Sequence, residues 1–286
     1  RELRQAAAQG EPPSCRGLAM GSFEHVTPEG FRVDGRRLHE PRCIRCAVGA
    51  AAIGGGSVGV GLGGGLEADG CAIFELGGTK AVAYVYGPME MRRGMQQHDR
   101  ATLSCSLSTA SFGTAVRLGG GGTRGRDRQS TERSLWIQQT FEHAILLEQY
   151  PRSQIRLYVQ LLQSDGGGVA AAINAATLAL ADAGIPMRDT VSACTAGMLG
   201  RRAAVDLSRD EEMAGGAQVT MATLAGARKV SLLEVESKVP EGMFAPLYET
   251  ALTGCDAIAL QMKACLLEHA TQSFSLRMSL RSGQKS

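Results

Sequence analysis

The stretch of residues 155–183 constrains the fold of this chain more than any other part of the sequence. Residues 155–163 (IRLYVQLLQ) alternate apolar and polar side chains, which is typical of a half-buried strand. An aspartate and three glycines follow at 165–168, and an alanine-rich segment then continues until Gly184. A glycine directly after the last helical residue is a common helix end. The sequence therefore predicts a strand, a tight turn and a helix in direct succession.

Further patterned runs predict more strands and two more helices. Residues 71–87 consist of two β-rich segments around Gly77-Gly78, which favours a hairpin. Strands mixed with helices in this way indicate the α+β class, with mixed sheets and packed helices. The other expected strands are residues 43–53, 101–112, 191–199, 204–208, 217–225 and 229–237, and the other expected helices are about 136–150 and about 240–270.

The chain has 286 residues, of which 44% are apolar, so it can bury one large core or two small ones. Residues 1–29 are expected to form a flexible N-terminal extension, because residues 1–21 are polar and lack the apolar stretch of a signal peptide. The patterned region predicts one domain over residues 30–270, with a glycine-rich insertion at 54–65 and a C-terminal tail at 271–286. We interpret the insertion as a flexible loop, because no Gly-Lys-Ser/Thr follows it.

Charge and hydropathy exclude several classes of protein. Thirty Lys and Arg against 28 Asp and Glu give a net charge of +2, so no strong overall field draws the chain to nucleic acid or membrane. The most continuous apolar stretch, residues 169–183, is too short and too polar to span a bilayer. We therefore expect no membrane segment, and any site for RNA or phosphate must be local.

Eight cysteines without a secretory leader favour a reducing compartment and free thiols. Cys43 and Cys46 form a CxxC pattern, but no second CxxC or histidine pair lies at a zinc-site spacing. We interpret the two as small apolar residues of a strand, with a metal or redox pair as the alternative. No metal site is predicted.

Three places in the sequence could carry chemistry. The glycine turn 165–168 enters a helix, whose free N–H groups and dipole favour an anion, although such a run is more often just a tight turn. Asp206, with Glu212 six residues on, could supply a general acid and a metal-binding neighbour, or form a solvated acidic turn. The arginine-rich segments 92–100 and 117–133 are expected to be loops, which could contact a phosphodiester backbone without reading its sequence, or be solvated surface.

Five segments of the chain, taken together and in order, resemble one family. They are FRVDGRR (31–37), ADGCAIFELGGTKAVAYVYGP (68–88), PRSQIRLYVQLLQSDGG (151–167), NAATLALADAGIPMRD (174–189) and VDLSRDEEMAGG (205–216). The family is that of ribonuclease PH, and within it the resemblance is to the exosome ring subunit that carries the phosphorolytic site in archaea. The similarity covers about residues 30–270 and implies a ribonuclease PH-like domain of β-α-β units.

The resemblance implies partners and a location. Relatives of this kind pair with a related subunit, and three pairs close into a six-membered ring around an RNA channel. The expected partners are therefore other ribonuclease PH-like exosome ring subunits, RNA-binding cap subunits, a hydrolytic nuclease subunit and single-stranded RNA, with no membrane. The expected location is the nucleus, the nucleolus and the cytoplasm.

The resemblance also implies a phosphorolytic site. In active relatives, phosphate attacks the 3′-terminal phosphodiester and releases nucleoside diphosphates. A loop ending in Ser/Thr-Arg holds the phosphate, and an aspartate supplies the proton to the leaving 3′ oxygen. The loop maps to Gly166, Gly167, Gly168 and Val169, the aspartate to Asp206, and its acidic companion to Glu212.

A valine in place of the loop arginine decides the functional prediction. Val169 has neither a hydrogen-bond donor nor a charge, whereas a charge-assisted hydrogen bond is worth about 1.5–3 kcal/mol. We therefore expect little or no phosphorolysis and no cofactor, with Asp206 and Glu212 vestigial. Alternatively, a partner chain or Arg201-Arg202 supplies the missing charge, and the chain is an active phosphate-dependent 3′→5′ exoribonuclease that uses Mg²⁺ and inorganic phosphate.

Arginines are expected to keep the contact with RNA. In active relatives an arginine pair just before the first long helix contacts RNA, and here that pair reads Arg128-Gln129. The loop with Arg92 and Arg93 corresponds to the one that lines the ring's entrance. The predicted function is a catalytically inactive ring subunit of the RNA exosome, which scaffolds the ring and guides single-stranded RNA to an associated nuclease for 3′→5′ processing and decay. The predicted RNA-binding residues are Arg92, Arg93, Arg124, Arg126 and Arg128.

Overall fold

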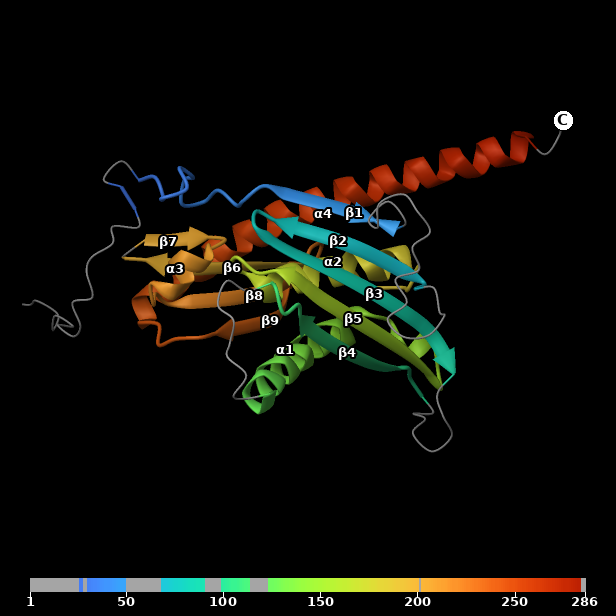
Figure 1. Ribbon diagram of the computed structural model, residues 1–286, viewed down its shortest axis with the longest axis horizontal. Coiled ribbons are helices and arrows are strands. Elements are labelled where there is room, and N and C mark those ends of the chain that lie inside the picture. Colours follow the sequence, from blue (N-terminus) through green and yellow to red (C-terminus); the bar gives the residue numbers. More distant parts are fainter. Residues whose placement is uncertain are drawn as a thin grey trace, which may run out of the picture.

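The computed structural model describes residues 26–27, 30–49, 68–90, 99–113, 123–200 and 202–283, with the backbone alone at 123–127 and 276–283. Two β-sheets, with helices between and beside them, form the described part of the chain (Figure 1). The predicted α+β class is confirmed. The glycine-rich insertion 54–65 and nearly all of the N-terminal extension 1–29 lie outside the described residues.

The larger sheet contains five strands in the order β1-β2-β3-β5-β4. β2 and β3 form the hairpin that was predicted around Gly77-Gly78. β4 runs parallel to β5, and the other neighbours are antiparallel. Alternate residues of β5, from Ile155 to Leu161, are at most 1% exposed, which confirms the predicted half-buried strand. The bounds are β1 Ile44–Val48, β2 Gly70–Leu76, β3 Thr79–Glu90, β4 Thr102–Thr109 and β5 Ser153–Gln163.

The smaller sheet contains four antiparallel strands in the order β7-β6-β8-β9. All four correspond to runs that the sequence predicts as strands. The expected run 204–208 ends early, because Asp206 takes a left-handed conformation with φ of 53° and turns the chain out of β7. The bounds are β6 Val191–Leu199, β7 Arg202–Val205, β8 Gln218–Leu224 and β9 Lys229–Val235.

Helix α2 (Gly168–Asp182) lies between the two sheets and forms the centre of the core (Figure 1). It contacts β2, β3 and β5 of one sheet and β6 and β8 of the other. Every residue from Val169 to Leu180 is buried, and half of them are alanines. A helix covered on all sides must be apolar all round, and small side chains let both sheets approach it closely. Its one buried amide, Asn174, exchanges two hydrogen bonds with the backbone of Ala193 in β6.

The other helices lie around the sheets. α1 (Thr123–Ala144) packs beside β4 and β9, and a short 3₁₀ turn, η4 (Leu147–Gln149), follows it. α3 (Arg209–Met213) follows β7, and α4 (Glu241–Gly283) crosses β6 and β8 and reaches β1. Figure 1 shows the C-terminal part of α4 projecting beyond both sheets. Within the described residues, no helix is long and apolar enough to cross a membrane.

Helix α1 begins earlier and ends sooner than the sequence predicts. It starts at Thr123, inside the segment that was expected to be an arginine-rich loop. Residues 123–133 contain no apolar side chain, so they show no helical period, although Arg, Gln and Glu favour helix. The helix ends at Ala144, not at Tyr150, because Leu146 and Ala144 pair with the backbone of residues 186–188.

Helix α4 continues beyond the expected start of the C-terminal tail. The polar composition after Thr271 predicts the end of the helix there, but the helical backbone extends to Gly283. Neither glycine nor proline interrupts residues 255–282, so no local signal stops the helix. The predicted tail 271–286 is therefore largely helical.

Candidate functional site

Glycines form the turn that leads from β5 into α2. Gly166 and Gly167 have φ of 82° and 62°, in the left-handed region that glycine adopts freely. An added Cβ on Gly166 would lie 2.3 Å from the carbonyl oxygen of Leu207. Gly167 is the N-cap of α2, so the free N–H groups of the first helical turn begin here. Glycine suits this course, because a side chain at Gly166 would clash and both positions lie in the left-handed region.

Asp206 is fully buried below the glycine turn, and Arg42 holds its carboxylate. Arg42 Nη2 and Nε donate to the two carboxylate oxygens at 2.7 and 2.9 Å, and the Arg42 main-chain N–H donates to Oδ2 at 2.8 Å. This bidentate geometry gives the strong form of the arginine–carboxylate pair. Burial acts to lower the pKa of Arg42, but the hydrogen bonds and charge of Asp206 outweigh it and raise the pKa.

Arg42 also fastens the glycine turn to the end of β7. Its Nη2 donates to the carbonyl oxygens of Gly166 and Leu207 at 3.3 and 3.2 Å, and its Nη1 donates to that of Asp165. The guanidinium is thus surrounded by acceptors, and the side chain is only 7% exposed. Arg42 is therefore committed to the fold and is not free to bind an anion at the turn.

Two more arginines from the N-terminal segment close over Asp206. The buried guanidinium of Arg32 donates to the Asp206 carbonyl oxygen at 3.0 Å and lies 3.4 Å from the Glu211 carboxylate. Burial lowers the pKa of Arg32, against the charge of Glu211. Arg36 Nη1 lies 3.6 Å from the Asp206 carboxylate. We call Asp206, Arg32, Arg36 and Arg42 the Asp206 cluster.

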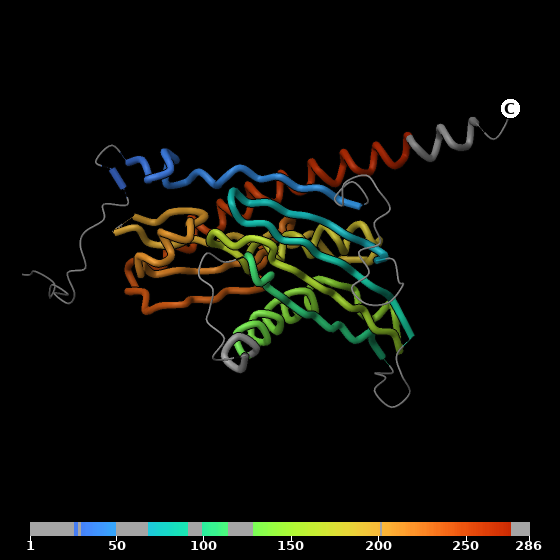
Figure 2. The backbone as a smooth tube through the Cα atoms, in the orientation of Figure 1, coloured from blue at the N-terminus to red at the C-terminus, as the bar shows by residue number. Residues whose placement is uncertain are grey.

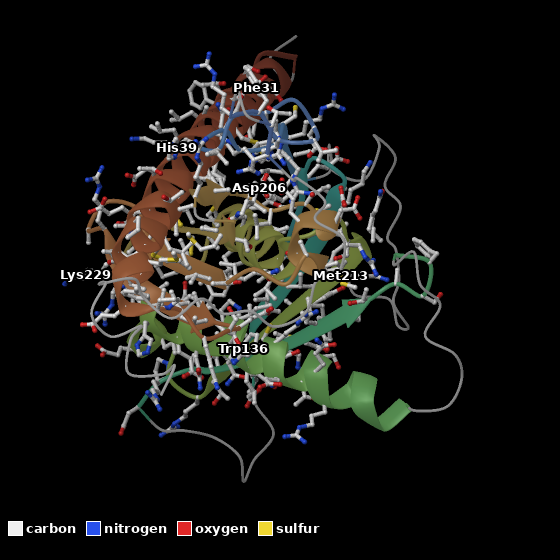
Figure 3. All side chains as sticks on the ribbon, turned by 90° about the vertical axis from the view of Figure 1, so that its left-hand side faces the viewer. Phe31, His39, Trp136, Asp206, Met213 and Lys229 are labelled. Atoms are coloured by element: carbon white, nitrogen blue, oxygen red, sulfur yellow. The ribbon has the colours of Figure 1, made fainter. Side chains whose placement is uncertain are left out.

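The course of the N-terminal segment explains how the cluster assembles. Figure 2 traces this segment along one side of the molecule, from the β7 end of the smaller sheet to the edge of the larger sheet. Val205 donates its N–H to the Leu38 carbonyl oxygen, which holds the segment against β7. Figure 3 shows Asp206 beneath the part of the segment that carries Phe31 and His39. The general-acid role of Asp206 stays a prediction, and this geometry favours a structural role.

Glu212, in contrast, faces the glycine turn. A capping box formed by Ser208 and Glu211 starts α3 and places Glu212 in its first turn. Glu212 Oε1 accepts the N–H of Gly167 at 2.7 Å. Burial raises the pKa of Glu212, and the charge of Glu236 acts in the same direction. Of the two predicted acidic residues, Glu212 is the one that the fold brings to the loop.

The remaining loop positions carry no charge. Gly168 is the first residue of α2, and Val169 beside it is buried, with 9% of its surface exposed. The Thr195 hydroxyl, which no sequence pattern singles out, is buried 3.4 Å from the position of an added Gly167 Cβ. Arg202 lies at the opposite end of β7 from Asp206, near Gly30, and Arg201 is outside the described residues.

An acidic group extends from Glu212 to the end of β9 and to α1. Glu234 of β9 interacts electrostatically with Glu132 of α1 and with Glu236, which directly follows β9, and Glu236 also acts on Glu212. Burial raises the pKa of Glu234 to about 7, with the charges of Glu236 and Glu132 acting in the same direction and Arg133 opposing them. Like charges this close disfavour a further anion at the site.

This group predicts a pH dependence of stability. Because the folded-state pKa of Glu234 is above its ordinary value of 4.5, the folded protein holds this proton more firmly than the unfolded chain. The stabilisation is complete below about pH 4.5 and is lost as the pH rises through about 7. We expect the thermal midpoint to fall between pH 5 and pH 8, and Glu234→Gln to reduce that fall. Exposed Glu249→Gln is the matched control, and an equal pH dependence in wild type and Glu234→Gln would contradict the assignment.

The predicted RNA-binding arginines are only partly described. Arg128 lies on α1 and is exposed, whereas Arg92 and Arg93 are outside the described residues. Arg124 and Arg126 belong to the first turns of α1, where the backbone alone is described. All three described positions are therefore helical, in place of the loop that the sequence predicts.

A cleft of about 640 Å³ opens beside the glycine turn, on the side of Asp165. Two cations, Lys80 and Arg209, line it together with Asp210. The Phe112 ring at the same cleft is 77% exposed. An exposed aromatic ring near cationic side chains is the combination that single-stranded nucleic acids use for stacking and backbone contact.

The cysteines of the described residues, seven in all, are free thiols. Cys43 is exposed, and Cys46 is partly buried against the core. Over the same described residues, no group of three or more His, Cys, Asp or Glu side chains could hold a metal ion. Within the described residues, the structure therefore does not support a metal site at Cys43 and Cys46.

Comparison with known proteins identifies the class. Residues 42–186 match the model of the 3′ exoribonuclease family, domain 1, and residues 189–252 match that of domain 2. The chain therefore belongs to the 3′ exoribonuclease family, and the resemblance to ribonuclease PH is confirmed. The two matched regions divide the chain between the end of α2 and the start of β6.

Within this family the chain is similar to one exosome component in particular. It is 45% identical over 252 residues to the exosome complex component RRP41 homolog of Arabidopsis thaliana, covering 87% of this chain and 97% of that protein. It is 41% identical over 260 residues to RRP41 of Homo sapiens, covering 89% and 98%. It is 35% identical over 244 residues to Rrp41 of Thermococcus onnurineus, covering 85% and 91%.

Solved structures show the same fold. Rice Rrp46 superposes with a TM-score of 0.66 at 22% identity, covering 82% of this chain and 100% of that one. A chain of the Archaeoglobus fulgidus exosome with RNA bound to the active site superposes with a TM-score of 0.64 at 20% identity, covering 82% and 93%. At these identities the likeness establishes the fold alone.

Proposed function

We propose that this chain is a ring subunit of an RNA exosome that scaffolds the ring and guides single-stranded RNA without catalysing phosphorolysis. The relatives at 41–45% identity are exosome complex components and match the chain over nearly their whole length. We infer that phosphorolysis is absent because Gly168 and Val169 stand at the start of α2, where binding of phosphate would require a guanidinium.

The local geometry supports this reading of the loop. The N–H of Gly167 is already taken by the Glu212 carboxylate, and Val169 is apolar and buried. Arg42 donates a hydrogen bond to Gly166 of the turn, but its guanidinium is already paired with the Asp206 carboxylate. A helix N-terminus alone contributes about 0.3–1 kcal/mol to binding an anion at an exposed site. Loss of one preorganised donor typically lowers the rate about 10²- to 10³-fold.

The RNA-guiding part of the proposal rests on one exposed arginine, two partly exposed cations, of which Lys80 also pairs with Glu75, and an exposed ring. Arg128 of α1 is exposed, and the cleft beside the glycine turn presents Lys80, Arg209 and Phe112. Contacts of this kind bind a phosphodiester backbone and stack bases without reading sequence. Within the proposal, Arg92, Arg93, Arg124 and Arg126 extend the same contact.

The proposed partners are other ribonuclease PH-like exosome ring subunits, RNA-binding cap subunits and a hydrolytic nuclease subunit. The names of the relatives as components of a complex support an assembly of this kind. The proposed location is the nucleus, nucleolus and cytoplasm, where such a complex would meet RNA precursors and transcripts.

Phosphorolysis of RNA tests the proposal directly. The chain, assembled with its ring partner, is incubated with single-stranded RNA and inorganic phosphate, and nucleoside diphosphates are measured. We expect release at least about 10²-fold below that of an active ribonuclease PH run in parallel. Binding of the same RNA should weaken in Arg128→Ala, which shows that substrate reached the assembly. Sustained phosphate-dependent release would establish the alternative, an active exoribonuclease.

That alternative has one observation in its favour. Burial raises the pKa of Glu212, which is the direction that a general acid requires, and its carboxylate contacts the N–H of Gly167. It needs a cation from a partner chain to hold the phosphate. Glu212→Gln would then abolish the phosphate-dependent release.

A further inference from the structure

The CxxC pattern does not act as a pair in this fold. Cys43 directly precedes β1, and Cys46 lies within it. An extended chain rises about 3.3 Å per residue and alternates its side chains, so positions three apart are about 10 Å apart and point to opposite faces. A disulfide requires Cα atoms within about 7 Å. Cys43 and Cys46 therefore cannot be joined while β1 is intact.

Cys46 instead meets Cys265 of α4, 219 residues further along the chain. The Cys265 Sγ donates to the main-chain oxygen of Cys46 at 3.4 Å, and the two thiols are close enough that Cys265 raises the pKa of Cys46. Both side chains are partly buried against the same core, and both are free. This tertiary contact gives Cys46 a thiol partner that no sequence spacing indicates.

Cys265 lies near the end of the part of α4 that packs against the body of the protein. Before it, the inward face of the helix is buried, and Ile258 and Met262 are at most 1% exposed. After it, Leu267 and Phe274 are 59% and 66% exposed. Figure 1 shows this last part of α4 extending beyond the sheets. A covalent bond at Cys265 would fix the base of the projecting segment to the edge of the larger sheet.

We propose that Cys46 and Cys265 are an oxidation site, at which hydrogen peroxide converts the two thiols into one disulfide that fastens α4 to β1. The Cys265 thiol loses its proton, and the thiolate attacks one peroxide oxygen. The O–O bond breaks, and the departing hydroxide combines with that proton to form water. The Cys46 thiol then attacks the sulfur of the resulting sulfenic acid and displaces a second water. Two thiols and one peroxide give one disulfide and two waters.

The order of attack follows from the surroundings of Cys46. Burial raises the pKa of the Cys46 thiol to about 12, and the neighbouring Cys265 and Glu268 act in the same direction. A thiol reacts with peroxide as its thiolate, so burial disfavours Cys46 as the site of first attack. We therefore assign the first oxidation to Cys265 and the resolving step to Cys46.

Peptide mapping of the oxidised full-length chain tests the site. The reduced protein is treated with hydrogen peroxide, alkylated and digested without reductant. We expect a disulfide-linked peptide that joins Cys46 to Cys265, and a rise in the thermal midpoint of roughly 5 °C or more. Cys43→Ser is the matched control and keeps both results, whereas Cys265→Ser loses both.

Three outcomes would overturn the proposal. They are a link between Cys43 and Cys46, a link between two chains, and complete alkylation of Cys46 and Cys265 after oxidation. Because wild-type protein gives all of these readouts, the test does not depend on whether a variant folds. It is also independent of the proposed exosome function, since neither RNA nor a ring partner is needed.

Discussion

Replacing Asp206 with asparagine is expected to lower the free energy of unfolding by about 3–5 kcal/mol, the usual cost of breaking a buried ion pair from one side. The variant removes the buried counter-charge of Arg42, which keeps only the half-exposed Asp165 carboxylate at 3.5 Å, and it removes the charge facing Arg36 as well. Asparagine has nearly the same shape and tolerates the positive φ of this position. The change therefore isolates the charge from the backbone. Chemical denaturation of wild type and variant measures it.

A surface pair provides the matched control. Asp256 and Arg228 lie 2.9 Å apart, but their side chains are 36% and 72% exposed. Asp256→Asn should change the unfolding free energy by only about 0–1 kcal/mol. If Asp206→Asn costs no more than Asp256→Asn, the Asp206 cluster does not stabilise the fold in the way described above.

This prediction changes how an activity assay on Asp206 should be read. Loss of activity in Asp206→Asn would be ambiguous, because the variant also loosens the glycine turn through Arg42. Glu212→Gln is the more direct test of acid–base chemistry, since Glu212 contacts the turn and lies outside the Asp206 cluster.

Restoring the missing loop residues should raise the affinity for phosphate roughly 10- to 150-fold, the equivalent of one charge-assisted hydrogen bond of about 1.5–3 kcal/mol. The variant is Gly168→Ser with Val169→Arg. A Cβ on Gly168 would lie 3.4 Å from Leu161 and Ser164, an ordinary contact, so serine fits. An arginine at 169 can pass its aliphatic stem through the buried position and present the guanidinium outside. Calorimetric titration with inorganic phosphate measures the gain.

The control for the loop variant adds the same charge elsewhere. Val230 lies on β9 and is 37% exposed, so Val230→Arg adds a guanidinium away from the turn. It should leave phosphate affinity nearly unchanged. Unchanged affinity in the loop variant, with an intact thermal transition, would count against the assignment of Gly168 and Val169 to a phosphate loop.

Local patterns predicted most of the elements, and the failures have physical causes. The hairpin at Gly77-Gly78 and the unit from β5 to α2 follow from period and turn chemistry alone. The first turns of α1 were predicted as a loop, because a solvated helix without an apolar face has no period to detect. The end of α4 was placed too early for a similar reason, since a projecting helix has no core on which to bury one face.

The sequence by itself determined the strand, the glycine turn and the apolar helix, together with the absence of a charged side chain at positions 168 and 169. Only the tertiary structure decided the roles of the two acids, placing Asp206 under Arg42 from 164 residues away and Glu212 against Gly167. It likewise brought Cys46 to Cys265 rather than to Cys43. The reason is physical: a local pattern fixes backbone conformation, but the burial and charge of a side chain depend on residues that only the folded chain brings near it.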